Sequence, residues 1–200
     1  MPTITLIMTG ASGAMYGLRL LEELVKAGCQ IYLLLSRPAH IVIKMETDLE
    51  LPVRASDVAL FFAQKYHAKT GQIKVFEKEQ WLAPIASGSG VADVTVVCPC
   101  TTGTLSSIAI GSSKNLLERA ADVALKERKK LILVVRETPF SEIHLENMLK
   151  LSRMGAIIMP ANPGFYFKPQ SVSDLVDFMV ARLLDHIGIQ NELQMQWGAK

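Results

Sequence analysis

The chain has 200 residues, of which half are apolar and 20% are charged, with 21 basic side chains against 19 acidic ones. This composition excludes an intrinsically disordered chain, and the near balance of charge excludes a general electrostatic attraction to nucleic acid. The length suits one core and no linker-like stretch divides it, so we expect a single domain over residues 1–200 with a tail from about residue 188.

Apolar runs of strand length alternate along the chain with segments of helical periodicity, which is typical of repeated β-α-β units. The expected strands are Ile4–Met8, Gln30–Leu35, Val94–Val97, Leu131–Val135 and Ala156–Met159, and the expected helices are 14–27, 115–128 and 173–187. The pattern predicts an α/β fold, a Rossmann-like three-layer sandwich with a mostly parallel central sheet flanked by helices. Residues 47–85 have weaker periodicity, and we expect a variable insertion there, with a helix beginning near Ser56 and a short strand near Ile73–Phe76.

The overall sequence also indicates in which cellular compartment the protein is expected. No stretch reaches the roughly 18 consecutive apolar residues of a membrane span, and the N-terminus does not begin like a secretion signal. The three cysteines, Cys29, Cys98 and Cys100, are an odd number and are expected to stay reduced, and a Cys-Pro-Cys pair without a second cluster is a poor metal site. We expect a cytoplasmic protein with no membrane contact, no metal site and no nucleic-acid partner.

Polar or turn residues follow every predicted strand. In open parallel sheets, ligands bind outside the carboxyl ends of the strands, where the loops meet at a reversal of strand order. The first such loop, residues 10–17, reads Gly-Ala-Ser-Gly-Ala-Met-Tyr-Gly, whereas a dinucleotide fingerprint needs G-x-G-x-x-G, so NAD is disfavoured. Its backbone N–H groups, the helix dipole and the Ser12 hydroxyl suit a mononucleotide phosphate, and a tight turn that merely needs glycine is the alternative.

Other segments carry weaker signals. The stretches Ser87–Gly90 and Thr101–Ser107 combine small hydroxyl side chains with glycine, although such clusters are most often ordinary loops. Arg136 and Glu137 directly follow an apolar strand, where an arginine can bind phosphate and a glutamate can exchange a proton, unless the pair only caps the strand.

Charged residues on two predicted helices admit plainer interpretations. Arg119 can pair with Glu118 and Asp122, and from spacing alone it is best explained, like Lys126, as part of a solvated ion pair. Arg182 is expected to project close to the apolar stripe of the last helix, where a charge needs a partner. We expect it to reach a neighbouring subunit or an anionic ligand, with snorkelling at the stripe edge as the alternative.

Longer motifs extend over almost the whole chain. They are residues 9–14, 46–48, 86–89, 98–106, 118–128, 136–139, 144–148 and 163–171. Together and in this order they resemble the flavin prenyltransferase family, the UbiX-type enzymes within the homo-oligomeric flavin-containing cysteine decarboxylases.

The resemblance implies that the dimethylallyl group of dimethylallyl monophosphate is transferred to N5 and then to C6 of reduced FMN, without a metal. The product, prenylated FMN, serves a separate decarboxylase in ubiquinone biosynthesis or aromatic-acid decarboxylation. It also implies a homo-oligomer, a dodecamer built from trimers, whose active site needs more than one chain.

The resemblance further implies roles for individual residues. FMN would be held by Gly10, Ala11, Ser12, Ser36, Ser87, Ser89, Thr101, Thr102, Gly103, Thr104 and Arg136, and the prenyl phosphate by Arg119, Lys126, Arg136, Tyr166 and Arg182. Glu137 would be the general acid and base for the released phosphate, and Ser12 would help to manage the proton at flavin N5. Lys126 would stabilise the departing phosphate and Trp81 the allyl cation, and the tail residue Trp197 would pack over the site.

Three other functions are considered. Relatives in the superfamily oxidatively decarboxylate a cysteine substrate, but here His40 follows the second strand and Pro160–Asn162 matches their substrate motif only faintly. Direct decarboxylation of a hydroxybenzoate has no residue constellation to support it. A flavin carrier would need the glycine loop but not the phosphate-binding residues.

Overall fold

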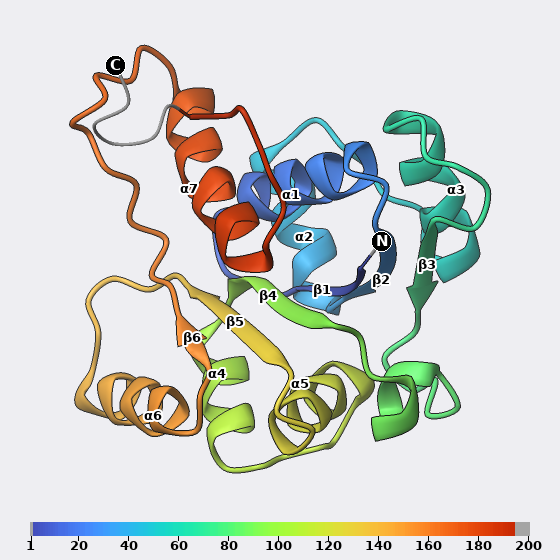
Figure 1. The fold of residues 1–200 in the computed structure, drawn as a ribbon, viewed down its shortest axis with the longest axis vertical. Coiled ribbons are helices and arrows are strands. Elements are labelled where there is room, and N and C mark those ends of the chain that lie inside the picture. The colour runs from blue at the N-terminus through green and yellow to red at the C-terminus, as the bar shows by residue number, and fades with distance from the viewer. Residues whose placement is uncertain (1, 195–200) are drawn as a thin grey trace.

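The computed structural model describes residues 2–194, in which six parallel strands form one sheet with helices on both faces (Figure 1). The strands are β1 Thr3–Met8, β2 Gln30–Leu35, β3 Ile73–Phe76, β4 Val94–Cys100, β5 Lys130–Val135 and β6 Ile157–Ile158. The helices are α1 Ala14–Lys26, α2 Arg37–Glu46, α3 Ala55–Lys65, α4 Thr102–Ala109, α5 Leu116–Lys126, α6 Glu142–Arg153 and α7 Val172–Ile187, with short 3₁₀ turns η1 Pro84–Ala86 and η2 Gly88–Gly90. The predicted Rossmann-like three-layer sandwich is confirmed.

The strand order is β3-β2-β1-β4-β5-β6, and every neighbouring pair is parallel. From β1, strands β2 and β3 are added towards one edge of the sheet, and β4 to β6 are added towards the other. The strand order therefore reverses between the neighbouring strands β1 and β4. In a sheet of this kind, the crevice at the carboxyl ends of those two strands is where a ligand is accommodated.

The two faces of the sheet follow from the alternation of side chains along the strands. In β1, Ile4 and Leu6 are fully buried in the layer that contains α1 and α7, whereas Ile7 is fully buried in the layer that contains α4 and α5. Figure 1 shows these two helical layers on opposite sides of the strands, with α3 beside the edge strand β3. Because apolar side chains cover both faces, the strands appear in the sequence as short continuous apolar runs.

Most expected elements are confirmed, with differences at their ends. The weakly periodic segment contains β3 as expected, and α3 begins close to Ser56. Strand β4 continues to Cys100, three residues further than expected, and β6 is only two residues long. The periodicity did not indicate α2, α4 or α6, because these helices bury few apolar residues each; their starts are marked instead by side-chain caps from Ser36, Thr101 and Ser141.

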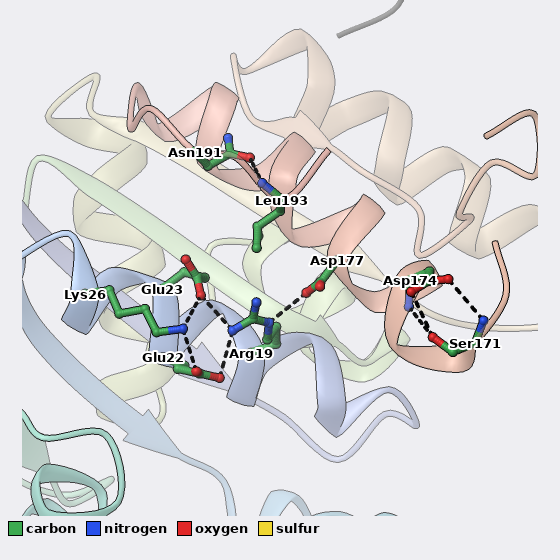
Figure 2. A network of polar contacts seen from close by, with 9 residues as sticks. All are labelled: Arg19, Glu22, Glu23, Lys26, Ser171, Asp174, Asp177, Asn191 and Leu193. Carbon is green, nitrogen blue, oxygen red and sulfur yellow. Dashed lines mark hydrogen bonds and ion pairs between the residues drawn. The ribbon is translucent and has the colours of Figure 1, made fainter. Parts of the chain in front are cut away.

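An ion-pair network joins α1 and α7, two of the helices on one face of the sheet (Figure 2). Arg19 of α1 contacts Asp177 of α7 through Nε at 2.7 Å, and its Nη1 lies 2.9 Å from Glu22 and 2.6 Å from Glu23. Lys26 pairs with the same two glutamates. This network fixes α7 against α1.

None of the helices in residues 2–194 is long and apolar enough to cross a membrane.

Candidate functional site

Four loops meet at the carboxyl edge of the sheet and are joined to one another by hydrogen bonds. The Thr9 hydroxyl donates to the Pro99 carbonyl (2.8 Å) and accepts from the N–H of Thr101 (2.9 Å), so it ties the loop after β1 to the loop after β4. The N–H of Ser36 donates to the last carbonyl of β1 (3.0 Å), and the N–H of Arg136 donates to the last carbonyl of β4 (3.3 Å). The convergence expected from the sequence is therefore present.

The backbone N–H groups at the N-terminus of α1 already donate to a carboxylate of the chain itself. The carboxylate of Glu46, at the end of α2, accepts from the N–H of Gly13 (2.9 and 3.1 Å) and from that of Ala14 (2.8 Å). The prediction that this helix end presents its N–H groups to a phosphate is thus wrong for these two groups. Gly10, Ala11 and Ser12 remain beside the switch point, with Ser12 exposed.

Glu46 was missed by the sequence argument, as was Thr9. Both residues belong to motifs that matched the family, but the sequence around each of them does not indicate which residue it contacts. The partner of Glu46 is 33 residues away in the sequence, and the partners of Thr9 are about 90 residues away.

Two hydroxyl side chains of the predicted FMN set cap helices at this edge. Ser36 Oγ accepts from the N–H of Ala39 (3.1 Å), and Thr101 Oγ1 accepts from that of Thr104 (3.1 Å). A hydroxyl has two lone pairs and one proton, so Ser36 Oγ can cap α2 and still donate to a ligand. The first turn of α4, which contains Thr102 and Gly103, presents free backbone N–H groups, and the helix dipole there favours an anion.

Arg136 and Glu137 complete the edge. The Nε atom of Arg136 is buried and has no hydrogen-bond acceptor among residues 2–194. A buried guanidinium donor without an acceptor is costly, so a ligand atom that accepts from it would be stabilising. The Glu137 carboxylate accepts from the N–H of Thr138 (3.1 Å) and lies 3.5 Å from the Thr102 hydroxyl, which fixes it next to the start of α4.

A second group of predicted residues lies at the other end of the sheet. Lys126 is the last residue of α5 and precedes the amino end of β5 by only four positions. Its ammonium pairs with Glu127, and a side chain at Gly88 would collide with that pair, so the Ser87–Ser89 turn packs directly against it. The sequence-based set is therefore divided within one chain, because Lys126 lies near the amino ends of the strands and Arg136 near their carboxyl ends.

Arg119 belongs to this second group. Its Nε donates to the Ala86 carbonyl (3.0 Å) and its Nη1 to Asp122 (2.8 Å). Of the two acidic neighbours suggested by the spacing, only Asp122 pairs with it, since Glu118 accepts instead from the loop before α5.

Tyr166 and Arg182 lie on the outer side of α7. The Tyr166 ring is 5.8 Å from that of Phe178, and Arg182 stands one turn after Phe178 on the same side of the helix. The prediction that Arg182 projects close to the apolar stripe is wrong. Its side chain is 50% exposed and pairs with Asp185 at 2.9 Å, because the buried face of α7 is formed by other positions.

The remaining residues singled out from the sequence belong to neither of these groups. Trp81 is 47% exposed in the loop between β3 and η1. Trp197 lies outside the described residues. Cys98 and Cys100 are fully buried at the end of β4, and desolvation raises the pKa of both thiols, that of Cys100 to about 12, so neither suits a nucleophilic role.

The site can be assigned to a class from these features. Hydroxyl-bearing helix starts lie at the carboxyl edge of a parallel sheet, beside an arginine whose buried Nε has no acceptor within residues 2–194. These features are typical of a nucleotide-binding α/β protein, and the family model described as Flavoprotein matches residues 1–184. The chain belongs to the UbiX flavin prenyltransferase family. It is 56% identical to the flavin prenyltransferase UbiX of Pseudomonas aeruginosa over 195 residues, which are 98% of this chain and 93% of the relative.

Two solved structures agree with this assignment. AnUbiX (PadA1), determined in complex with FMN and dimethylallyl pyrophosphate, is 40% identical with a TM-score of 0.87, and the match covers 100% of this chain and 98% of that one. A dodecameric FMN-dependent UbiX-like decarboxylase from Escherichia coli O157:H7 is also 40% identical, with a TM-score of 0.85 and coverage of 98% and 100%.

Proposed function

We propose that this chain is a flavin prenyltransferase that moves the dimethylallyl group of dimethylallyl monophosphate to N5 and C6 of reduced FMN. The family assignment supports this reaction, and so does the relative whose structure is in complex with FMN and dimethylallyl pyrophosphate. The observation that carries the proposal in this chain is the buried Arg136 Nε, which has no acceptor within residues 2–194 and lies at the carboxyl edge where the loops converge.

The residues at the carboxyl edge suit FMN. We assign the phosphate to the Ser36 hydroxyl and to the first turn of α4, with Thr101–Thr104, and the adjacent part of the ligand to Gly10–Ser12 and Arg136. Hydroxyls, backbone N–H groups and a guanidinium are the donors that a phosphate monoester prefers. When bound in its reduced form, FMN supplies the electron-rich nitrogen and carbon that accept the allyl group.

Glu137 is assigned the proton transfer to and from the phosphate that leaves. Its carboxylate is held by Thr138 and Thr102 beside Arg136, so a phosphate held by the arginine would lie within reach of it. A cation at the leaving group stabilises the charge that develops as the allylic bond breaks. Ser12, exposed on the loop after β1, is assigned the proton at flavin N5.

The prenyl phosphate needs further cations, and we assign these to other copies of the chain. Lys126, Arg119, Ser87 and Ser89 cluster at the amino end of the sheet, away from Arg136 of the same chain. A homo-oligomer, which we propose to be a dodecamer like the relative from E. coli, would bring this cluster of one chain to the carboxyl edge of another. Tyr166, Arg182 and Trp81 are assigned to the same composite site.

The product, prenylated FMN, is proposed to pass to a separate decarboxylase that depends on it, in ubiquinone biosynthesis or in the decarboxylation of aromatic acids. We place the reaction in the cytoplasm, because its flavin substrate must be reduced. The three cysteines, which form no disulfide in the structure, are compatible with a reducing compartment.

The reaction is tested by anaerobic incubation of the purified protein with reduced FMN and dimethylallyl monophosphate in the presence of a metal chelator. Mass spectrometry of the released flavin should show the mass of one added five-carbon unit. Arg136→Gln should abolish this product, whereas Arg54→Gln, at the exposed start of α3, should not change it. Flavin that is bound but never modified would refute the proposal in favour of a carrier.

The composite site has its own test. Arg136→Gln and Lys126→Ala should each be inactive alone, but co-expression of the two variants should restore part of the activity. In a mixed oligomer, some sites receive an intact Arg136 from one chain and an intact Lys126 from the other. Activity that stays absent in the mixed oligomer would place both residues in a single chain's site and refute the assignment.

A further inference from the structure

Arg119 is held more firmly than the other arginines of the predicted phosphate set. Its guanidinium is planar and has five N–H donors, and two separate acceptors occupy it: the Ala86 carbonyl at Nε and the Asp122 carboxylate at Nη1. The side chains of Arg119 and Asp122 are 32% and 29% exposed. By contrast, Arg182 and Asp185 are about half exposed, and one contact joins them.

Asp122 is itself supported from the other side. The Ser113 hydroxyl, in the turn before α5, lies 3.3 Å from Asp122 Oδ2, the same oxygen that accepts from Arg119. A continuous series of contacts thus runs from Ser113 through Asp122 and Arg119 to Ala86, beside the Ser87–Ser89 turn. Within residues 2–194, the second terminal nitrogen of Arg119, Nη2, has no hydrogen-bond partner in this series.

We propose that Asp122 is a positioning residue, which orients the guanidinium of Arg119 so that Nη2 is presented to the phosphate of the prenyl donor. The inference rests on the proposed function. Asp122 touches neither substrate, and its contribution is geometric: a long arginine side chain loses much rotamer freedom when it binds an anion. If Asp122 and Ala86 have already removed that freedom, binding of the phosphate costs less.

A double-mutant cycle separates this role from a structural one. Asp122→Asn should raise KM for dimethylallyl monophosphate about tenfold and change kcat by less than about threefold, since one charge-assisted contact is lost. In an Arg119→Ala background, the same Asp122→Asn change should have no further effect on KM. An equal rise in KM in both backgrounds, or no rise in the native background, would overturn the proposal.

Two further variants keep the test decisive if Asp122→Asn folds poorly. Arg119→Lys retains the charge but has a single nitrogen, which cannot serve Ala86, Asp122 and a phosphate together. It should show the same rise in KM, and a native KM would overturn the proposal. Asp122→Glu keeps the carboxylate and should recover part of the affinity, whereas a KM as high as that of Asp122→Asn would count against the role of the charge.

The control is Glu22→Gln, which removes a similar partner, 2.9 Å from Arg19, on the far side of the molecule. It should leave both kinetic constants unchanged. The two proposals fail in different ways. If the native protein forms no prenylated flavin, the proposed function fails and this inference fails with it; if the native protein is active and the cycle shows no coupling, only the positioning role fails.

Discussion

The carboxylate of Glu46 holds the loop after β1 against the end of α2, and its removal should loosen that loop. Glu46→Ala leaves the N–H groups of Gly13 and Ala14 without the acceptor that now receives hydrogen bonds of 2.8–3.1 Å. Glu46→Gln keeps an oxygen acceptor but removes the negative charge at the positive end of the α1 dipole.

The size of the effect follows from these contacts. Loss of a helix N-cap costs about 0.5–2 kcal/mol, and hydrogen bonds to a charged group contribute about 1.5–3 kcal/mol. Water can reach this partly exposed site and recover part of the loss, so we expect about 2 kcal/mol for Glu46→Ala and about 1 kcal/mol for Glu46→Gln. In a chain of this length, these values correspond to a Tm lowered by about 4–8 °C and about 2–4 °C.

The assay is thermal unfolding followed by circular dichroism at fixed protein concentration, because oligomer assembly makes Tm depend on concentration. The matched control is Glu50→Gln, four residues later, whose exposed carboxylate pairs with Lys44 and should leave Tm unchanged. If Glu46→Ala has the Tm of the native protein, the contacts of Glu46 do not stabilise the fold. If Glu46→Gln has the native Tm while Glu46→Ala does not, the negative charge at this helix end contributes nothing and only the hydrogen-bond acceptor matters.

Three other predictions concern stability and reactivity. Burial lowers the pKa of His40, so the unfolded chain binds more protons below about pH 6.5; stability should fall as the pH drops through that value, and His40→Gln should reduce the fall in Tm measured between pH 8 and pH 5. Gly17→Ala would press a methyl group against the Cys98 carbonyl and should lower Tm by several degrees, whereas Gly103→Ala, whose nearest neighbour is 4.0 Å away, should not. Because burial raises the pKa of Cys100 to about 12 and Cys98 is also fully buried, neither thiol should react with a disulfide reagent at pH 8 until denaturant is added; rapid labelling of the native protein would refute this.

Local patterns identified much of the fold. The strand Gln30–Leu35 was predicted at its observed position, because a strand covered on both faces must be a short apolar run wherever it stands in the chain. The edge strand Ile73–Phe76 was also predicted, although only Ile73 of it is buried. The family motifs, each a few residues long, identified the flavin prenyltransferase family, since each motif keeps its spacing whether or not the chain is folded. Helices that bury few apolar residues, such as α6, were not indicated, because periodicity reports only the face that is buried.

Contacts between distant segments depended on the tertiary structure. No spacing could show that Glu46 occupies the N-terminus of α1, since the strand order and the path of α2 bring those residues together. Arg136 and Lys126 are only ten positions apart in the sequence, yet β5 lies between them and carries one to the carboxyl edge while the other stays at the amino end. The sequence by itself determined the family, the fold class and the side chains available for chemistry. Which of them one chain can gather into a single site was decided by the tertiary structure, because the direction of each parallel strand fixes the end of the sheet at which a residue emerges.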